Sequence, residues 1–392
     1  MPRPSRTIAT EKRAAKDEGG ISATKKIKVD EKDLDIWNSI NLDKLDIKAF
    51  YQYIKSNDNR IHITNELGYS LLYLAAYNKS MEALRILLLQ PDMDVNRLNG
   101  PHNELALHAA CSKGLYDAVE LLLENGSIVN IKDSLGHTPL TNAIFSNCFQ
   151  TVEFLVNNGT ADVSVIDEQG NSLLHLAASN GFTAVIPLLI EKGVSVDNLN
   201  TRGISPLAIA ISLGYIDTAK SLIDGGADVN GKTRFATVLH HAITWNRLEI
   251  VKKLVELQCD VNVVNVLEET PLYLAVQQRK IDIVRFLIVE AKADPCFMPN
   301  NPANTTNLPL LYAANHGYTE MSKILITPKT SNFFIQTSID MSKRVGHLGT
   351  EEYLNEQLIT RLQVSTPVES NDIRDEDFAS LFKSFSDEEE EE

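Results

Sequence analysis

The chain has 392 residues, of which 43% are hydrophobic and 23% charged, enough apolar material for one elongated or two compact domains. Its four cysteines are widely spaced and form no CxxC pair, so the sequence predicts neither a disulfide framework nor a zinc site, and we expect no cofactor. The formal net charge of −15 argues against direct nucleic-acid binding, because phosphate backbones are bound by clustered Lys and Arg.

Residues 1–30 form a basic head that we expect to be disordered. This segment holds eight Lys and Arg against four Asp and Glu, whereas residues 366–392 hold two against eleven. The head has no apolar stretch that would indicate a signal peptide. No apolar run in the chain approaches the roughly 18 residues of a membrane helix, so we expect no membrane partner.

Two basic clusters in the head are separated by eleven residues. They are Lys12-Arg13 and the group Lys25, Lys26 and Lys28. The pattern resembles a bipartite nuclear localisation signal, which implies importin as a partner and a location in both nucleus and cytoplasm. The alternative is an ordinary solvated basic tail, since short basic clusters arise often by chance.

Residues 31–63 carry an apolar pattern of helical spacing, which includes Leu45, Phe50 and Ile54. We interpret this segment as a degenerate N-terminal cap for the repeats that follow it.

Residues 64–326 contain one ten-residue pattern eight times, and its third position is always leucine. The successive leucines lie 32 to 38 residues apart, and an apolar pair or triplet follows most of them. The eight segments are SLLYLAAYNK (70–79), LALHAACSKG (105–114), TPLTNAIFSN (138–147), SLLHLAASNG (172–181), SPLAIAISLG (205–214), TVLHHAITWN (237–246), TPLYLAVQQR (270–279) and LPLLYAANHG (308–317).

Each residue type in this pattern has a physical role in a helix pair. Thr or Ser caps the first helix and Pro fits its first turn. A small pair such as Ala177-Ala178 lets neighbouring helices approach closely, and Gly181 or Gly214 ends the helix with a left-handed residue. One unit cannot bury its own apolar face, so stacked neighbours supply the core.

The pattern resembles the ankyrin repeat, with its TPLHxAAxxG helix opening and its GADVN close. The resemblance implies an all-α solenoid of helix pairs joined by β-hairpin loops, which we expect to be flanked by disordered tails. It also implies a non-enzymatic binding protein. Histidines at the fourth position, His108, His175 and His240, are expected to hydrogen-bond the neighbouring hairpin and not to bind a metal.

The resemblance further implies a concave groove that holds a protein partner. Family contacts come from the residue that follows the hairpin glycine position and from the two residues after the small pair. Carried onto this sequence, these positions and the irregular sixth hairpin give the expected groove residues Tyr69, Tyr77, Phe145, Asn171, Ser179, Leu213, Phe235, Trp245 and Gln277.

Trp245 is a candidate binding anchor, because tryptophan and tyrosine are common anchors at protein interfaces. The alternative is that Trp245 folds over its neighbours as partial core. The sixth repeat is irregular, since Phe235 stands where the hairpin glycine is expected.

Residues 327–364 contain GTEEYLNEQLITRL, which echoes GYTEMSKILI of the last clear repeat. We interpret this segment as a degenerate ninth unit that forms the C-terminal cap. The longest spacing, 38 residues, indicates an inserted loop from Phe297 to Asn307. An enzyme confined to residues 327–364 is disfavoured, because the segment is shorter than a typical catalytic domain.

Residues 365–392 form an acidic tail that we expect to be disordered. Phe378, Leu381, Phe382 and Phe385 have helical spacing and would form one apolar stripe. The stripe resembles the apolar cores of acidic activation segments, which implies a partner with an apolar groove. The alternatives are that it docks on the ankyrin body, or that the glutamates serve solubility.

Two functional hypotheses remain open at this point. The first is a nuclear adaptor that regulates a transcription or chromatin partner. The second is an ankyrin effector that an intracellular bacterium secretes into host cells, with the glutamate-rich C-terminus acting as an export signal.

Overall fold

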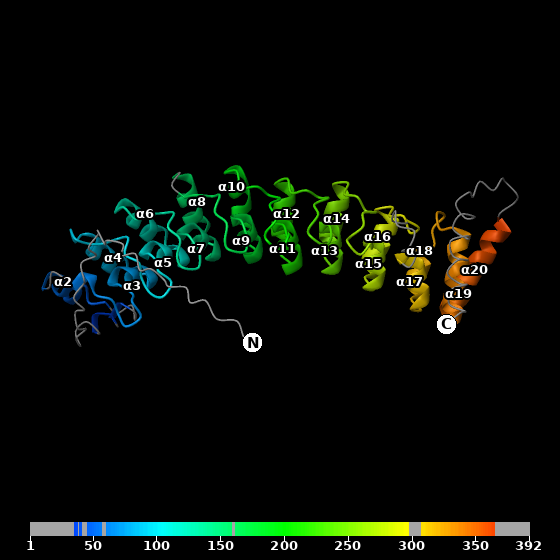
Figure 1. The fold of residues 1–392 in the computed structure, drawn as a ribbon, viewed down its shortest axis with the longest axis horizontal. Coiled ribbons are helices and arrows are strands. Elements are labelled where there is room, and N and C mark those ends of the chain that lie inside the picture. The colour runs from blue at the N-terminus through cyan, green and yellow to red at the C-terminus, as the bar shows by residue number, and fades with distance from the viewer. Residues whose placement is uncertain are drawn as a thin grey trace, which may run out of the picture.

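The protein is described by a computed structural model, and the described residues are 35–37, 39–40, 45–56, 60–158, 161–297 and 307–364. Within this part of the chain, helix pairs stack side by side in one curved row from α2 to α20 (Figure 1). The first helix of each pair lies along the inner side of the arc and the second along the outer side (Figure 1).

Eight first helices follow the eight sequence segments. Ser70, Thr138, Ser205 and Thr270 accept a backbone N–H with their side chains, as expected of helix N-caps. The first helices are α3 Leu71–Tyr77, α5 Ala106–Ser112, α7 Pro139–Phe145, α9 Leu173–Asn180, α11 Pro206–Leu213, α13 Val238–Thr244, α15 Pro271–Gln277 and α17 Pro309–Asn315.

Eight second helices pack behind them. Their apolar pairs and triplets face the first helices of their own and the adjacent repeat, so the core runs unbroken along the stack. The second helices are α4 Met81–Leu88, α6 Tyr116–Glu124, α8 Phe149–Asn157, α10 Ile186–Glu191 after the 3₁₀ turn η2 Thr183–Val185, α12 Ile216–Asp224, α14 Leu248–Glu256, α16 Ile281–Val289 and α18 Thr319–Leu325.

The third-position leucine is buried in every repeat, which confirms its predicted place in the core. Gly181 and Gly214 end their helices with φ of 68° and 85°, as predicted. In other repeats a side chain takes this left-handed conformation, as at Lys79 with φ 63° and Asn246 with φ 54°. The stack therefore imposes the turn even where the sequence offers no glycine.

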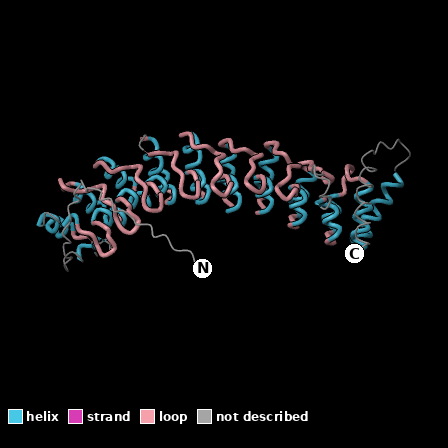
Figure 2. The backbone as a smooth tube through the Cα atoms, viewed as in Figure 1, coloured by secondary structure: helices cyan, strands magenta, loops and turns pink. Residues whose placement is uncertain are grey.

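The hairpins hold one another through their backbones. Bonds between successive hairpins run from Gly100 N to Gly68 O (3.1 Å), Ser134 N to His102 O (2.8 Å), Thr201 N to Gln169 O (2.9 Å), Arg234 N to Gly203 O (2.9 Å) and Val266 N to Phe235 O (3.1 Å). Within the described residues the hairpins contain isolated antiparallel bridges, such as Ile166 with Ser172, and no longer strand (Figure 2).

The sixth hairpin differs from the expectation that Phe235 replaces a glycine. Thr233 N donates to Ala236 O, three residues on, whereas Asp133 N in the third hairpin donates to His137 O, four residues on. The hairpin is thus one residue shorter, and the left-handed position is absent from it. Phe235 consequently has an ordinary negative φ.

Both ends of the described stack carry further helices. At the start are α2 Ile47–Ser56 and the turn η1 Arg60–His62, and at the end α19 Asn332–Val345 and α20 Leu348–Val364. Phe50 and Leu354 are fully buried against the adjacent repeats. Whether these helices act as solubilising caps stays a prediction. The head, the tail and residues 298–306 of the expected inserted loop lie outside the described residues.

Candidate binding groove

The predicted groove residues lie on the hairpins and at the C-terminal ends of the first helices. In the first repeat, Tyr69 and Tyr77 both stack on Tyr73, with ring centroids 4.7 Å and 6.1 Å apart. Lys113 of the next repeat places its Nζ 3.8 Å from the centre of the Tyr77 ring. The sequence prediction named Tyr69 and Tyr77, and the structure joins them into one aromatic ladder.

Tyr73 ties this ladder to the second repeat, because its hydroxyl donates to Glu104 Oε2 at 2.5 Å. Burial, followed by the Glu104 carboxylate, raises the pKa of Tyr73 far above its ordinary value. Tyr73 therefore stays a neutral donor at physiological pH and fixes the ladder in place.

The middle of the groove presents apolar side chains to solvent. Phe145 meets His137 edge to face, with centroids 5.4 Å apart. Leu213 and Trp245 stand at the C-terminal ends of α11 and α13, and Trp245 is 49% exposed. Trp245 lies outside the buried core cluster, so the partial-core alternative gains no support from its packing.

Three predicted groove residues are engaged within the fold. Asn171 Nδ2 donates to Asp167 Oδ2 at 2.9 Å, and its Oδ1 accepts Asn200 Nδ2 at 2.8 Å. Ser179 Oγ donates to Leu176 O at 2.8 Å in its own helix. Gln277 Nε2 lies 3.4 Å from Glu269 Oε1. A partner would compete with these bonds, so we rank these positions below the aromatic ones.

The fourth-position histidines serve the scaffold, as predicted. His108 Nε2 lies 3.1 Å from His137 O, His175 Nε2 lies 3.0 Å from Ile204 O, and His240 Nε2 lies 3.0 Å from Glu269 O. Burial lowers the pKa of each histidine, and that of His240 to about 4, because a charged imidazole loses its hydration there. Among the described residues, no group of three His, Cys, Asp or Glu could hold a metal ion.

Sequence reasoning missed a set of exposed apolar residues on the hairpins. The repeat pattern predicts where each hairpin lies but not which side chains are exposed on it. The sequence feature that could have identified them is an apolar residue at a hairpin position that is usually polar in ankyrin repeats. They are Leu67, Leu98, Leu135, Ile166, Leu199, Val266 and Leu267.

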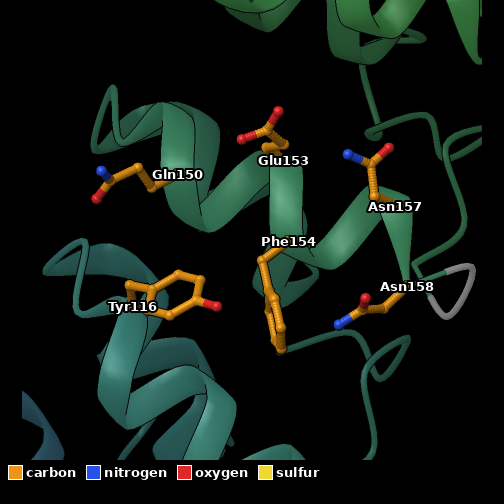
Figure 3. Close-up of a pocket in the computed structure, with 6 residues that line it drawn as sticks. All are labelled: Tyr116, Gln150, Glu153, Phe154, Asn157 and Asn158. Carbon is orange, nitrogen blue, oxygen red and sulfur yellow. The ribbon is translucent and has the colours of Figure 1, made fainter.

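The outer face carries an open cavity of about 400 Å³ between α6 and α8 (Figure 3). Tyr116 and Phe154 meet edge to face in it, with centroids 5.0 Å apart. The other lining residues are Gln150, Glu153, Asn157 and Asn158, which include no acid–base pair or nucleophile. The cavity offers no catalytic arrangement.

A family model described as "Ankyrin repeats (3 copies)" matches residues 43–133, 72–167, 126–200, 159–233 and 239–337. The chain belongs to the ankyrin-repeat family. Ankyrin repeats indicate protein–protein interaction, and the family is typically non-enzymatic. No described helix is long and apolar enough to cross a membrane.

Several named proteins are similar to this ankyrin chain. The Gallus gallus nuclear factor NF-kappa-B p105 subunit is 28% identical over 232 residues, which are 58% of this chain and 20% of that protein. The Mus musculus B-cell lymphoma 3 protein homolog is 31% identical over 132 residues, 32% of this chain and 29% of that protein. This chain therefore spans a fifth to a third of the length of these two relatives.

The Saccharomyces cerevisiae probable 26S proteasome regulatory subunit p28 is 26% identical over 155 residues, 39% of this chain and 68% of that protein. Among solved structures, the human ASB11 ankyrin repeat domain has 29% identity and a TM-score of 0.48, covering 53% of this chain and 91% of that chain.

Proposed function

We propose that this ankyrin chain is a non-enzymatic adaptor of the nucleus that holds a regulatory protein partner against its concave face. The observation that carries the proposal is the line of solvent-exposed large side chains along the first helices, Tyr77, Phe145, Leu213 and Trp245. Exposed aromatic side chains add little to folding, whereas such residues dominate the binding energy of protein interfaces.

The nuclear part of the proposal is supported by the two basic clusters of the head, which lie outside the described residues. The name of one similar protein, the nuclear factor NF-kappa-B p105 subunit, agrees with a role in the nucleus. Importin is the proposed partner of the head, and a groove-bearing protein that of the apolar stripe in the tail.

The groove is tested with the double variant Tyr77→Ala and Trp245→Ala in the full chain. Partners are captured on immobilised protein and quantified by mass spectrometry, and the affinity of the most enriched one is then measured. We expect a loss of more than about 2 kcal/mol in binding and a nearly unchanged melting temperature.

Tyr51→Ala on α2 is the matched control, because Tyr51 and Tyr77 are each 43% exposed and Tyr51 precedes the eight repeats. Equal capture by the double variant and wild type would refute the groove assignment. A large fall in melting temperature would instead show that the two aromatic side chains serve the core.

The second proposal, a secreted bacterial effector, rests on the run of glutamates that closes the sequence. A secretion assay separates it from the first. Export from a bacterial host that is lost when the terminal glutamates are replaced by glutamine would favour the effector, and retention would exclude it.

A further inference from the structure

The fifth, sixth and seventh hairpins form one continuous surface. Arg234 N donates to Gly203 O at 2.9 Å, and Val266 N donates to Phe235 O at 3.1 Å, so the backbones of the three hairpins lie side by side. Six of its exposed side chains are large apolar or basic residues of the three hairpin turns. We call them the hairpin patch: Arg202, Lys232, Arg234, Phe235, Val266 and Leu267.

Half of the hairpin patch is apolar. Phe235, Val266 and Leu267 are 59%, 62% and 65% exposed, and they lie on adjacent hairpins that the bond from Val266 N joins. Single exposed apolar side chains are ordinary, but contiguous ones mark interaction surfaces. The structure gives these three no packing role in the fold, since none belongs to the core cluster or packs against it.

The other half is basic on a chain of net charge −15. Arg202, Lys232 and Arg234 make no ion pair with a described residue. Arg234 places its guanidinium carbon 5.4 Å from the centre of the Phe235 ring, which joins the basic and apolar halves. The cations are therefore free to meet carboxylates from outside.

Most carboxylates around the hairpin patch are hydrogen-bonded to other residues. Glu269 is buried and bonds to Asn265 Nδ2 at 2.8 Å, and Asp228 accepts Asn230 N at 2.9 Å. Glu268 is half-buried beside Leu267 and is the acidic group at the apolar end. The excess of positive charge thus lies over the fifth and sixth hairpins.

We propose that the hairpin patch binds an acidic segment of a partner protein that carries large apolar side chains. The inference rests on the proposed adaptor function and names the chemistry of its partner. Carboxylates of the segment pair with Arg202, Lys232 and Arg234, which speeds the encounter and selects against basic segments. The apolar side chains of the segment cover Phe235 and Leu267 and supply most of the affinity.

Nucleic acid fits the same surface poorly. Three cations neutralise few phosphates, and the remainder of this acidic chain repels the polyanion. Base stacking could occupy Phe235, but Val266 and Leu267 would stay exposed to water. An acidic segment with apolar side chains uses both halves of the hairpin patch.

The test measures binding of a fluorescent peptide to the full chain by anisotropy. The probe is DFASLFKSFSDEEEEE, which has the sequence of residues 377–392 and combines carboxylates with four large apolar side chains. Two matched peptides complete the set: one has Asn and Gln for Asp and Glu, and the other has Ser for Phe and Leu. We expect both to bind at least about tenfold more weakly than the probe.

Variants of the chain assign the binding to the hairpin patch. The double variant Arg202→Glu and Arg234→Glu should lower the affinity for the probe about tenfold or more. The affinity of this variant should also depend less on salt concentration. Leu267→Ser should lower the affinity for the probe several-fold and leave its salt dependence unchanged. The matched control is Arg85→Glu with Arg285→Glu, two exposed arginines on the second helices α4 and α16. Circular dichroism confirms that each variant is folded.

Each outcome decides the proposal. Equal binding by the patch and control variants overturns it, as does patch-dependent binding of a DNA oligonucleotide that matches or exceeds the peptide. The probe could also bind only when the chain carries Phe378→Ala and Phe382→Ala. That result would show that the chain's own C-terminal segment occupies the hairpin patch, and it would overturn the assignment to a partner. Loss of probe binding in the patch variants, with partner capture unaffected by Tyr77→Ala and Trp245→Ala, would support the patch and refute the groove proposal.

Discussion

The buried histidines make the stability of this stack depend on pH, and His240 allows the size of the effect to be worked out. His240 Nε2 lies 3.0 Å from Glu269 O, and its Nδ1 lies 2.8 Å from Thr237 Oγ1. The pKa of His240 is lowered from an ordinary value of 6.5 to about 4, mainly by burial and to a smaller extent by the adjacent His241, while the bond to Glu269 O opposes the shift. The folded state therefore holds this imidazole neutral.

The sign of the effect follows from linkage. Because the folded pKa lies below the unfolded one, the stabilisation is complete above pH 6.5 and is lost as the pH falls toward 4. A shift of this size corresponds to about 3 kcal/mol in total. About 2 kcal/mol of it should be lost between about pH 7 and about pH 5. Burial also lowers the pKa of His108, His175 and His241, which adds to the loss in the same direction.

The variant His240→Gln isolates the contribution of His240 to the pH dependence of stability. The glutamine amide can donate to Glu269 O, as His240 does, but it does not titrate. Urea unfolding followed by circular dichroism gives the free energy of unfolding of both proteins at each pH. The advantage of wild type over the variant should shrink by about 2 kcal/mol from about pH 7 to about pH 5. His316→Gln is the control for the same chemical change on an exposed side chain. A pH-independent advantage, or a pKa near 6.5 for His240 by NMR, would refute the reasoning.

Three further predictions address the backbone, the core and the head. Lys79→Gly should stabilise the chain by about 1 kcal/mol in urea unfolding, because glycine relieves the left-handed φ of 63°, and a loss of stability would contradict this. Leu207→Ala should cost about 2–5 kcal/mol in the same assay, since the side chain is fully buried, whereas a cost below about 1 kcal/mol would show that the repeats repack freely. Replacing Lys25, Lys26 and Lys28 with alanine should abolish nuclear accumulation of a fusion too large to diffuse through nuclear pores, as seen by fluorescence microscopy. Unchanged accumulation would reject the signal.

The repeat architecture could be predicted from the sequence because its determinants are local and occur eight times. The buried leucine, such as Leu174, and the left-handed glycine, such as Gly181, each follow from packing or backbone rules that act within about ten residues. Local rules do not predict the positions that depart from this pattern. Lys79 and Glu268 take left-handed conformations that their own residue types disfavour, because contacts with neighbouring repeats override the local preference.

The groove stays a prediction, and the exposure of its residues could be predicted only in part. Family positions located Tyr77 and Trp245, which are indeed exposed, yet they also selected Asn171, whose side chain bonds to Asp167 and Asn200. The sequence marks Phe235 as an irregularity of the sixth repeat, but the repeat pattern does not single out Val266 or Leu267. Side-chain hydrogen bonds and contacts between hairpins depend on the three-dimensional stack, so a reading of one repeat at a time does not reach them.

The nearest-neighbour bonding of the hairpins has a mechanical consequence. The described hairpins bond only to adjacent hairpins, as Arg234 N does to Gly203 O, and a terminal unit therefore has a stabilising neighbour on one side only. When force is applied to the two ends of the stack, the terminal units should detach first. Single-molecule stretching should therefore give a sawtooth trace in which units detach from an end inward. Each event should release a contour length of roughly 110 Å, the extended length of a 33-residue repeat. The molecule would then behave as a soft spring at low load and as a sequence of discrete extensions at high load.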